Sequence, residues 1–235
     1  MGIWENRRIQ MRPKRSNVDK KVENDNFEII GHGENSVTYQ LFNELDKHKL
    51  SLLLNNNTNW INKIKIKKED IEEVHLFPSF GKRYGYGEPD VLILASKIVI
   101  YVEVELCDLE RKKLPDPFVK QMEKFKNLAN DISKSDRKKL RLINKFEGEC
   151  GYKFLGQKKL RSLYSKIKDD DRVPCLLVIS NSSSREVKAV DLERKMKSKG
   201  LDLNGLNLGW GSFRKIRNMK QLSSTAKTIK YNLDK

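Results

Sequence analysis

The chain contains 235 residues, of which 48 are Lys or Arg and 32 are Asp or Glu, and its formal net charge at pH 7 is +16. This length allows one domain with a sizeable hydrophobic core. No apolar run approaches the ~20 residues that a membrane-spanning helix needs, and the few scattered cysteines and histidines argue against a disulfide framework and against a zinc site. Because the N-terminus also lacks an apolar signal core, we expect a soluble intracellular protein, cytoplasmic or, in a eukaryote, nuclear.

The chain divides into three segments of different character. Residues 1–25 are polar and basic, which predicts a loosely ordered arm. Apolar side chains recur periodically over residues 26–220, where we expect the folded domain, and residues 221–235 form a C-terminal tail. Within the domain, a basic helical insertion is predicted at about residues 133–170.

An amphipathic helix is predicted over residues 35–45, because apolar side chains recur there at the i, i+3, i+4 spacing of one helix face. These side chains are Val37, Thr38, Leu41, Phe42 and Leu45. Extending this stripe backwards by one turn reaches Glu34, at the start of the core-facing side. The carboxylate of Glu34 either serves a functional site or only complements the dipole at the helix N-terminus.

Extended structure is predicted next. Residues 61–68 alternate between apolar and basic types, which fits a strand or a short helix, and residues 74–77 are a second short extended candidate. The clearest pattern is a β-hairpin formed by residues 90–94 and 98–106, because two runs rich in Val, Ile and Leu flank a short turn.

The elements after the hairpin predict the fold class. A helix entered through Pro115-Asp-Pro117 carries an apolar stripe at Phe118, Met122, Phe125, Ala129 and Ile132. Residues 173–180 have the length and apolar character of a buried strand, and a further helix is predicted with Ser184 as its N-cap and Gly200 as its C-cap. This order of helices and strands predicts an α/β fold in which helices flank a central mixed β-sheet.

The positive charge is concentrated in residues 111–170, which contain 18 Lys or Arg and 8 Asp or Glu. Such a stretch favours attraction to a polyanion, and we expect nucleic acid, DNA rather than RNA, and no membrane. The alternative is a solvated, lysine-rich helix surface. The candidate contacts to nucleic acid are Lys112, Lys113, Lys120, Lys138, Lys139 and Arg141.

The hairpin register brings carboxylates together. If Leu94 lies opposite Val99, the same register places Asp90 opposite Glu103, and strand alternation places Glu105 on the same face as Glu103. Clustered carboxylates repel one another, and a divalent cation would neutralise them. Ligands that are all oxygen suit Mg²⁺ or Mn²⁺. The alternative is a hairpin with an exposed acidic face and no metal.

These residues also carry a family resemblance. Pro89-Asp90, followed after twelve residues by Glu103-Val-Glu105, resembles the signature of the PD-(D/E)XK nuclease superfamily. The resemblance covers about residues 34–182 and implies a restriction-endonuclease-like core: a helix bearing an acid, a strand pair bearing the motif, a flanking helix and a further strand. It implies that Asp90, Glu103 and Glu34 bind the metal ion.

One position departs from the family pattern. Glu105 stands where the motif usually has lysine, so either Glu105 acts there itself or a lysine on the following helix takes over. Lys124 is a better substitute than Lys120, since it lies at the margin of the apolar stripe beside Gln121. Gln121 belongs to a Gln-Met-Glu-Lys-Phe element that is similar to the Gln-x-x-x-Tyr element of exonuclease-like branches.

The leading hypothesis is therefore a Mg²⁺-dependent or Mn²⁺-dependent nuclease that hydrolyses DNA phosphodiester bonds. Its catalytic residues would be Asp90, Glu103, Glu105, Lys124 and Gln121. One rival is a catalytically inactive nucleic-acid-binding module on the same fold, and another is an RNA-binding protein unrelated to nucleases. The sequence is compatible with a monomer and with a homodimer.

Overall fold

The structure is a computed structural model of the chain, and it describes residues 34–43, 45–78, 86, 88–110, 113–133, 166–167, 172–182, 186–203 and 205–217. The predicted N-terminal arm, the C-terminal tail and most of the predicted basic insertion therefore lie outside the described residues. None of the helices in the described ranges is long and apolar enough to cross a bilayer.

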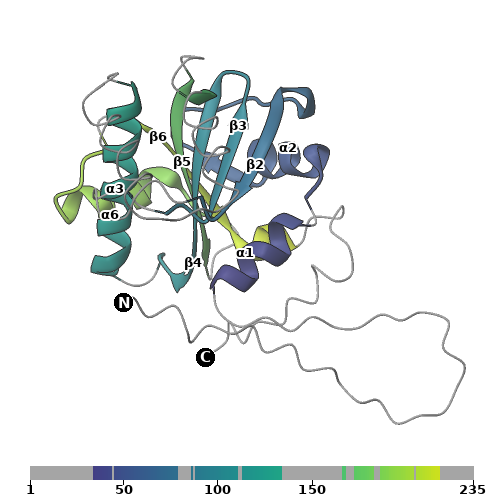
Figure 1. Cartoon of the computed structure of the whole chain (residues 1–235). Helices are drawn as coiled ribbons and strands as arrows, with labels where there is room; N and C mark the ends of the chain where they lie inside the picture. The colour runs from purple at the N-terminus through teal and green to yellow at the C-terminus, as the bar shows by residue number, and fades with distance from the viewer. Residues whose placement is uncertain are drawn as a thin grey trace, which may run out of the picture.

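A six-stranded mixed sheet occupies the centre of the molecule (Figure 1). The strands are β1 (Thr58–Trp60), β2 (Ile71–Leu76), β3 (Val91–Ala95), β4 (Ile98–Asp108), β5 (Val173–Asn181) and β6 (Asn207–Ser212). They lie in the order β1-β6-β5-β4-β3-β2, in which β4, β5 and β6 are parallel and the other neighbouring strands are antiparallel. This arrangement confirms the prediction of an α/β fold with a mixed sheet.

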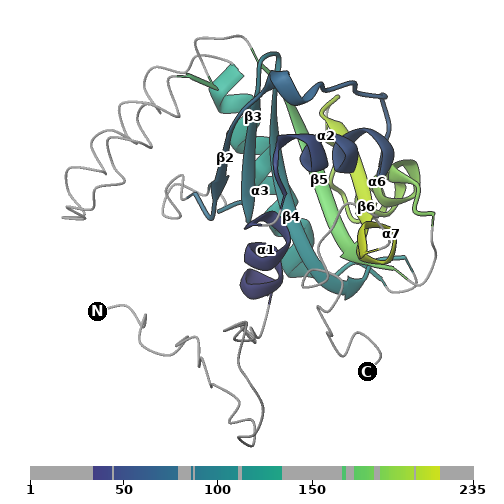
Figure 2. The same ribbon diagram turned by 90° about the vertical axis from the view of Figure 1, so that its right-hand side faces the viewer.

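Helices cover both faces of the sheet, as Figure 2 shows from the side. One face packs against α3 (Asp116–Ser133) and α6 (Ala189–Ser198), and the other packs against α1 (Glu34–Asn43), α2 (Lys47–Asn56) and α7 (Phe213–Arg217). Alternate residues of each central strand enter the two cores, because strand side chains point to opposite faces. In β4, Val99 and Tyr101 face α3, whereas Ile100, Val102 and Val104 face α1 and α2.

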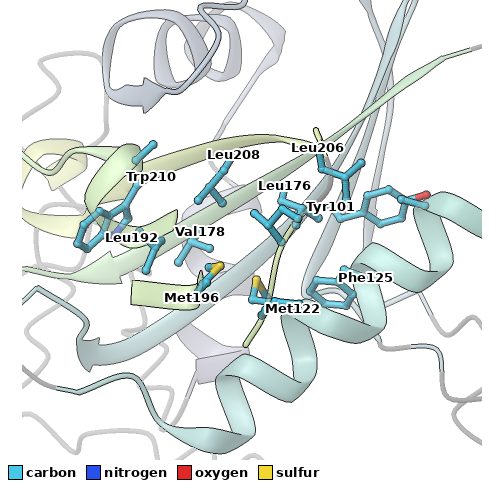
Figure 3. Close-up of a cluster of buried hydrophobic side chains, with 14 of the residues drawn as sticks. Tyr101, Met122, Phe125, Leu176, Val178, Leu192, Met196, Leu206, Leu208 and Trp210 are labelled. Atoms are coloured by element: carbon cyan, nitrogen blue, oxygen red, sulfur yellow. The ribbon is translucent and has the colours of Figure 1, made fainter. Parts of the chain in front are cut away.

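The apolar stripe predicted for the helix after Pro115 is the buried face of α3. Phe118, Met122, Phe125 and Ala129 are all buried against the sheet, and the side chain of Ile132 lies outside the described residues. Figure 3 shows Met122 and Phe125 pointing towards Tyr101 and Leu176 of the sheet and Met196 of α6. The helix predicted over residues 35–45 is likewise present as α1, with Val37, Thr38, Leu41 and Phe42 buried.

The helix predicted to start at Ser184 begins later, at Ala189, and Lys188 is its N-cap. The N–H of Ala189, the first residue of α6, finds its hydrogen-bond acceptor in another element: it donates to Oδ1 of Asn59 in β1 at 2.8 Å. A partner 130 positions away in the sequence replaces the local serine cap, which is why the local pattern was misleading. Gly200 lies one residue beyond the C-cap, at φ 84°, where glycine is favoured.

The segment predicted as a strand or short helix over residues 61–68 is neither of these. Residues 61–67 form no regular element and lead into a short 3₁₀ helix, η1 (Lys68–Asp70). Ile66 is buried while the neighbouring lysines are exposed. The segment is held by Asn55, whose side chain makes hydrogen bonds of 3.0 and 2.7 Å with the backbone N–H and C=O of Ile66.

The buried strand β6 contains two glycines with different surroundings. A Cβ added at Gly209 would lie 2.6 Å from Cε3 of Trp60, whereas the nearest atom to a Cβ at Gly211 is 3.6 Å away. Glycine at position 209 therefore allows the indole of Trp60 to lie directly on the backbone of β6. A strand with this composition has a low β-propensity, and its packing determines its conformation.

We predict that Gly209→Ala lowers the free energy of unfolding by about 1–3 kcal/mol, because the new methyl group forces the Trp60 ring away from β6. Gly211→Ala is the matched control and should leave stability unchanged or slightly higher, since alanine costs less backbone entropy than glycine. Urea unfolding of the two variants measures the difference. Equal losses in both would contradict the close packing of Trp60 on Gly209.

Candidate active site

The candidate site begins with the register of the β3–β4 hairpin. Leu94 pairs with Val99 and Val91 pairs with Val102, which confirms the predicted register. Leu92, Leu94, Val99 and Tyr101 all face α3. Because strand side chains alternate, Asp90, Glu103 and Glu105 lie on this same face, beside the end of β3 and along the second half of β4.

Asp90 is bound directly to β4. Its Oδ2 accepts a hydrogen bond from the backbone N–H of Val104 at 2.8 Å. Burial raises the pKa of Asp90, and the negative charge of Glu105 raises it further, whereas the bond from Val104 lowers it; the result is a pKa of about 6. The ionised form of Asp90 is therefore destabilised in the folded protein, and nearby positive charge would stabilise it.

Glu103 and Glu105 are both partly buried and have different surroundings. Glu103 pairs with Val178 of β5, and its Oε2 is buried. Glu105 pairs with Ser180 of β5, and its Oε1 accepts a hydrogen bond from the Cys107 N–H at 3.1 Å. The pairing of β4 with β5 becomes irregular just after Glu105, so this carboxylate lies where the regular part of the strand ends.

Helix α3 is fixed beside Asp90 through Gln121. Its Nε2 donates a hydrogen bond of 3.2 Å to the backbone carbonyl of Glu88, two residues before Asp90. Lys124 lies one turn further along the same side of the helix and is partly buried, whereas Lys120 is exposed. This difference in burial agrees with the predicted position of Lys124 at the margin of the apolar stripe.

Glu34, the remaining predicted metal ligand, lies on helix α1. It is the first residue of α1, and α1 packs on the sheet face opposite to the one that carries Asp90 and Glu105. The side chain of Glu34 lies outside the described residues. Among the described side chains, no group of three Asp, Glu, His or Cys residues is arranged to hold a metal ion.

Asp90, Glu103 and Glu105 nevertheless offer the carboxylate oxygens that Mg²⁺ prefers as ligands. Asp90 and Glu105 are close enough for their charges to interact, and the partners found for them are the neutral amides of Val104 and Cys107. Mg²⁺ is usually held by one or two carboxylates and retains several water molecules, so it does not need a complete protein cage. Asp90 and Glu103, with the Val104 carbonyl, would supply such a set of oxygen ligands.

In the described part of the basic stretch, residues 111–170, some lysines are exposed and others form ion pairs. Lys113 and Lys120 are exposed. The pKa of Asp116, at the start of α3, is lowered mainly by a 2.7 Å hydrogen bond from Lys199 and further by the positive charges of Lys113 and Lys120. Lys166, by contrast, forms an ion pair with Glu73 of β2. The candidates Lys112, Lys138, Lys139 and Arg141 lie outside the described residues.

The sequence did not indicate a row of hydroxyl groups beside Glu105. Ser180 of β5 pairs with Glu105 on one side and with Ser212 of β6 on the other. The Nε1–H of Trp210 donates to Ser180 Oγ at 2.8 Å. Trp210 and Ser212 could not be placed near the acids because the glycine-rich sequence of β6 does not predict a strand.

Comparison of the chain with models of protein families, with curated proteins and with solved structures gives no match. The chemistry proposed for the site therefore depends on the arrangement of its own residues.

The pKa of Asp90 predicts a pH dependence of stability. Because its folded-state pKa of about 6 lies above the unfolded value of 3.8, the contribution of Asp90 to stability is complete below about pH 4 and is lost as the pH rises through 6. Asp90→Asn should remove this loss and raise the free energy of unfolding at neutral pH by up to about 3 kcal/mol, without a matching gain at about pH 4.

Urea unfolding in EDTA at a series of pH values measures this effect. Asp116→Asn is the control of opposite sign, because the pKa of Asp116 is lowered in the folded state and its contribution to stability is lost on acidification. A stability difference between Asp90→Asn and the unmodified protein that does not change with pH would contradict the assigned environment of Asp90.

Proposed function

We propose that this protein is a metal-dependent nuclease that hydrolyses DNA phosphodiester bonds, with a core of the restriction-endonuclease type. The observation that carries the proposal is the hydrogen bond between Asp90 and Val104. It joins the Asp of the motif to the middle residue of Glu103-Val-Glu105, beside helix α3, whose Gln121 donates to the carbonyl of Glu88.

The order of elements supports the same proposal. Along the chain, helix α1 comes before the hairpin β3–β4, with α2, β1, η1 and β2 between them, and α3 and then β5 follow the hairpin. This is the order that the resemblance to the PD-(D/E)XK nucleases implies. Strand β5 lies parallel to β4, and helix α3, which follows β4 in the chain, packs on the face that carries the acids.

Asp90 and Glu103 would hold a Mg²⁺ or Mn²⁺ ion through their carboxylates. Such an ion supplies Lewis-acid stabilisation of the phosphoryl oxygens and of the leaving oxygen, and it lowers the pKa of bound water. Lys124 would bind a non-bridging oxygen of the phosphate, where developing charge is stabilised. Glu105 would accept the proton of the attacking water, and Gln121 would hold the Glu88–Asp90 backbone in place.

Removing either metal ligand tests this assignment. Asp90→Ala and Glu103→Ala should each lower the rate of Mg²⁺-dependent cleavage by at least about 100-fold, because metal binding then loses a carboxylate. The affinity for DNA in EDTA should be unchanged or higher, since a negative charge near the polyanion has been removed. The substrates to compare are supercoiled plasmid, single-stranded DNA and branched DNA, with and without Mg²⁺ or Mn²⁺.

Glu123→Ala is a matched control, because Glu123 is an exposed acid on α3 with no role in the proposed site. It should cleave DNA at the unmodified rate. Binding of DNA that is equal in Mg²⁺ and in EDTA, without cleavage of any substrate, would replace the nuclease proposal with the rival of an inactive nucleic-acid-binding module. The departure from lysine at Glu105 is the feature that favours this rival.

The role of Lys124 is tested separately. Lys124→Ala should reduce the cleavage rate by about 10-fold or more with little change in DNA affinity, as expected for an interaction made mainly in the transition state. Lys120→Ala is the control, because Lys120 lies one turn earlier on α3 and is exposed. Single-turnover cleavage and binding in EDTA separate the two quantities. Cleavage at the unmodified rate by both variants would mean that neither Lys124 nor Lys120 takes part in catalysis.

A further inference from the structure

Phe77 has an unusual backbone conformation. Among the described residues it is the one non-glycine residue with a positive φ, 51°. The left-handed region disfavours side chains because Cβ approaches the backbone, and bulky residues are rare there. Glycine or asparagine would form the same turn with less strain. The turn at the end of β2 therefore does not explain why position 77 is a phenylalanine.

The aromatic ring of Phe77 is not explained by the hydrophobic core either. Its relative exposure is 38%, and the residue belongs to neither of the two buried clusters. The next residue, Pro78, is buried and has a fixed φ. An aromatic residue with more than a third of its surface exposed is thus held in a strained conformation. Strain of this kind is concentrated at functional sites.

Phe77 lies beside the candidate site. Its backbone N–H donates a hydrogen bond of 2.8 Å to the carbonyl of Asp90. This bond extends the pairing of β2 with β3 by one position beyond Leu76 and Val91. Phe77 is therefore fixed relative to the same residue whose carboxylate binds Val104 on the other side.

We propose that the ring of Phe77 is a stacking platform for an unpaired nucleobase next to the phosphate that the site binds. This inference rests on the proposed function and specifies its substrate as DNA with at least one unpaired base. Stacking on an aromatic ring suits every base, because each base has a π-face. Phenylalanine has no polar group that could read base edges, so the platform is tolerant of sequence.

A protein partner fits this feature less well. The nearest exposed apolar residue along β2 is Val74, but Val74 pairs with Ile93, which belongs to the opposite face of the sheet. Within the described residues, one exposed ring at this end of β2 does not provide the extended apolar patch that protein interfaces need. The chain also has a net charge of +16, which favours a polyanion.

Binding of single-stranded DNA in EDTA tests the proposal without catalysis. Fluorescence anisotropy with a labelled oligothymidylate should show that Phe77→Ala binds about 5- to 100-fold more weakly, which is the usual effect of removing one stacked base. Phe77→Trp should keep the affinity. Tyr39→Ala is the matched control, because Tyr39 is an exposed aromatic residue on α1, on the other sheet face, and it should bind normally.

Two further measurements separate stacking from a structural role. An oligonucleotide carrying abasic positions should lose affinity for the unmodified protein and lose much less for Phe77→Ala. Phe77→Gly should bind as weakly as Phe77→Ala while its resistance to urea is maintained or increased, because glycine removes the strain. A structural role predicts the reverse for Phe77→Gly: lower stability and unchanged affinity.

The outcomes distinguish this inference from the proposed function. Suppose that the protein cleaves DNA, but its affinity for single-stranded DNA is absent or does not change with Phe77→Ala and with abasic positions. The stacking platform is then refuted, and the proposed nuclease function stands. If binding depends on Phe77 but no substrate is cleaved with any metal, the platform stands and the hydrolytic function is refuted.

Discussion

The hydrogen bond from the Val104 amide to the Asp90 carboxylate determines the geometry of the candidate site. The regular pairing of β3 with β4 ends at Val91 and Val102, and the side chain of Asp90 continues the connection to β4 from there. Without this acceptor, a partly buried amide of β4 would need another partner. The same bond lowers the pKa of Asp90 and so offsets part of the cost of burying its charge. The Asp90 carboxylate thus both joins the end of β3 to β4 and supplies a ligand in the proposed chemistry.

The sequence predicted those parts of the fold that depend on local pattern. The hairpin register follows from the alternation of residues 90–106, and the buried face of α3 follows from its helical period, so both predictions were confirmed. Helix α2 was missed although its signal is present: Asp46 caps it by accepting from the Lys49 N–H, and Leu50, Leu53 and Leu54 form its buried face.

Elements that depend on distant partners were not predictable in this way. The start of α6 is set by Asn59, and β6 is a strand because it pairs with β5 and β1 and receives the ring of Trp60. Among the site residues, Asp90, Glu103 and Glu105 could be placed on one sheet face from the sequence, since they belong to one hairpin. Phe77 could not be recognised, because a backbone torsion angle leaves no sign in the residue pattern.

Net charge alone overstates how much of the basic stretch is available to a polyanion. Lys166 and Arg172, which lie at and just beyond its C-terminal end, are held by Glu73 and Glu72 of β2. The Arg172 side chain is almost fully buried and also donates to the carbonyl of Ala95 at 2.6 Å. These two cations attach the chain to the edge of the sheet before β5 begins. The exposed Lys113 and Lys120, near the start of α3, remain accessible to phosphate.

The end of the sheet near Asp90 combines two unfavourable features. A carboxylate with a raised pKa lies next to another acid, and a strained aromatic residue is bound to its backbone. Conflicts of this kind between local preference and the fold are expected at functional sites. A phosphodiester approaching alone would add negative charge to Asp90 and Glu105 and would be repelled. Under the proposed function, a cation would enter before the phosphate or with it, and the exposed lysines of α3 would attract the rest of the DNA from outside the site.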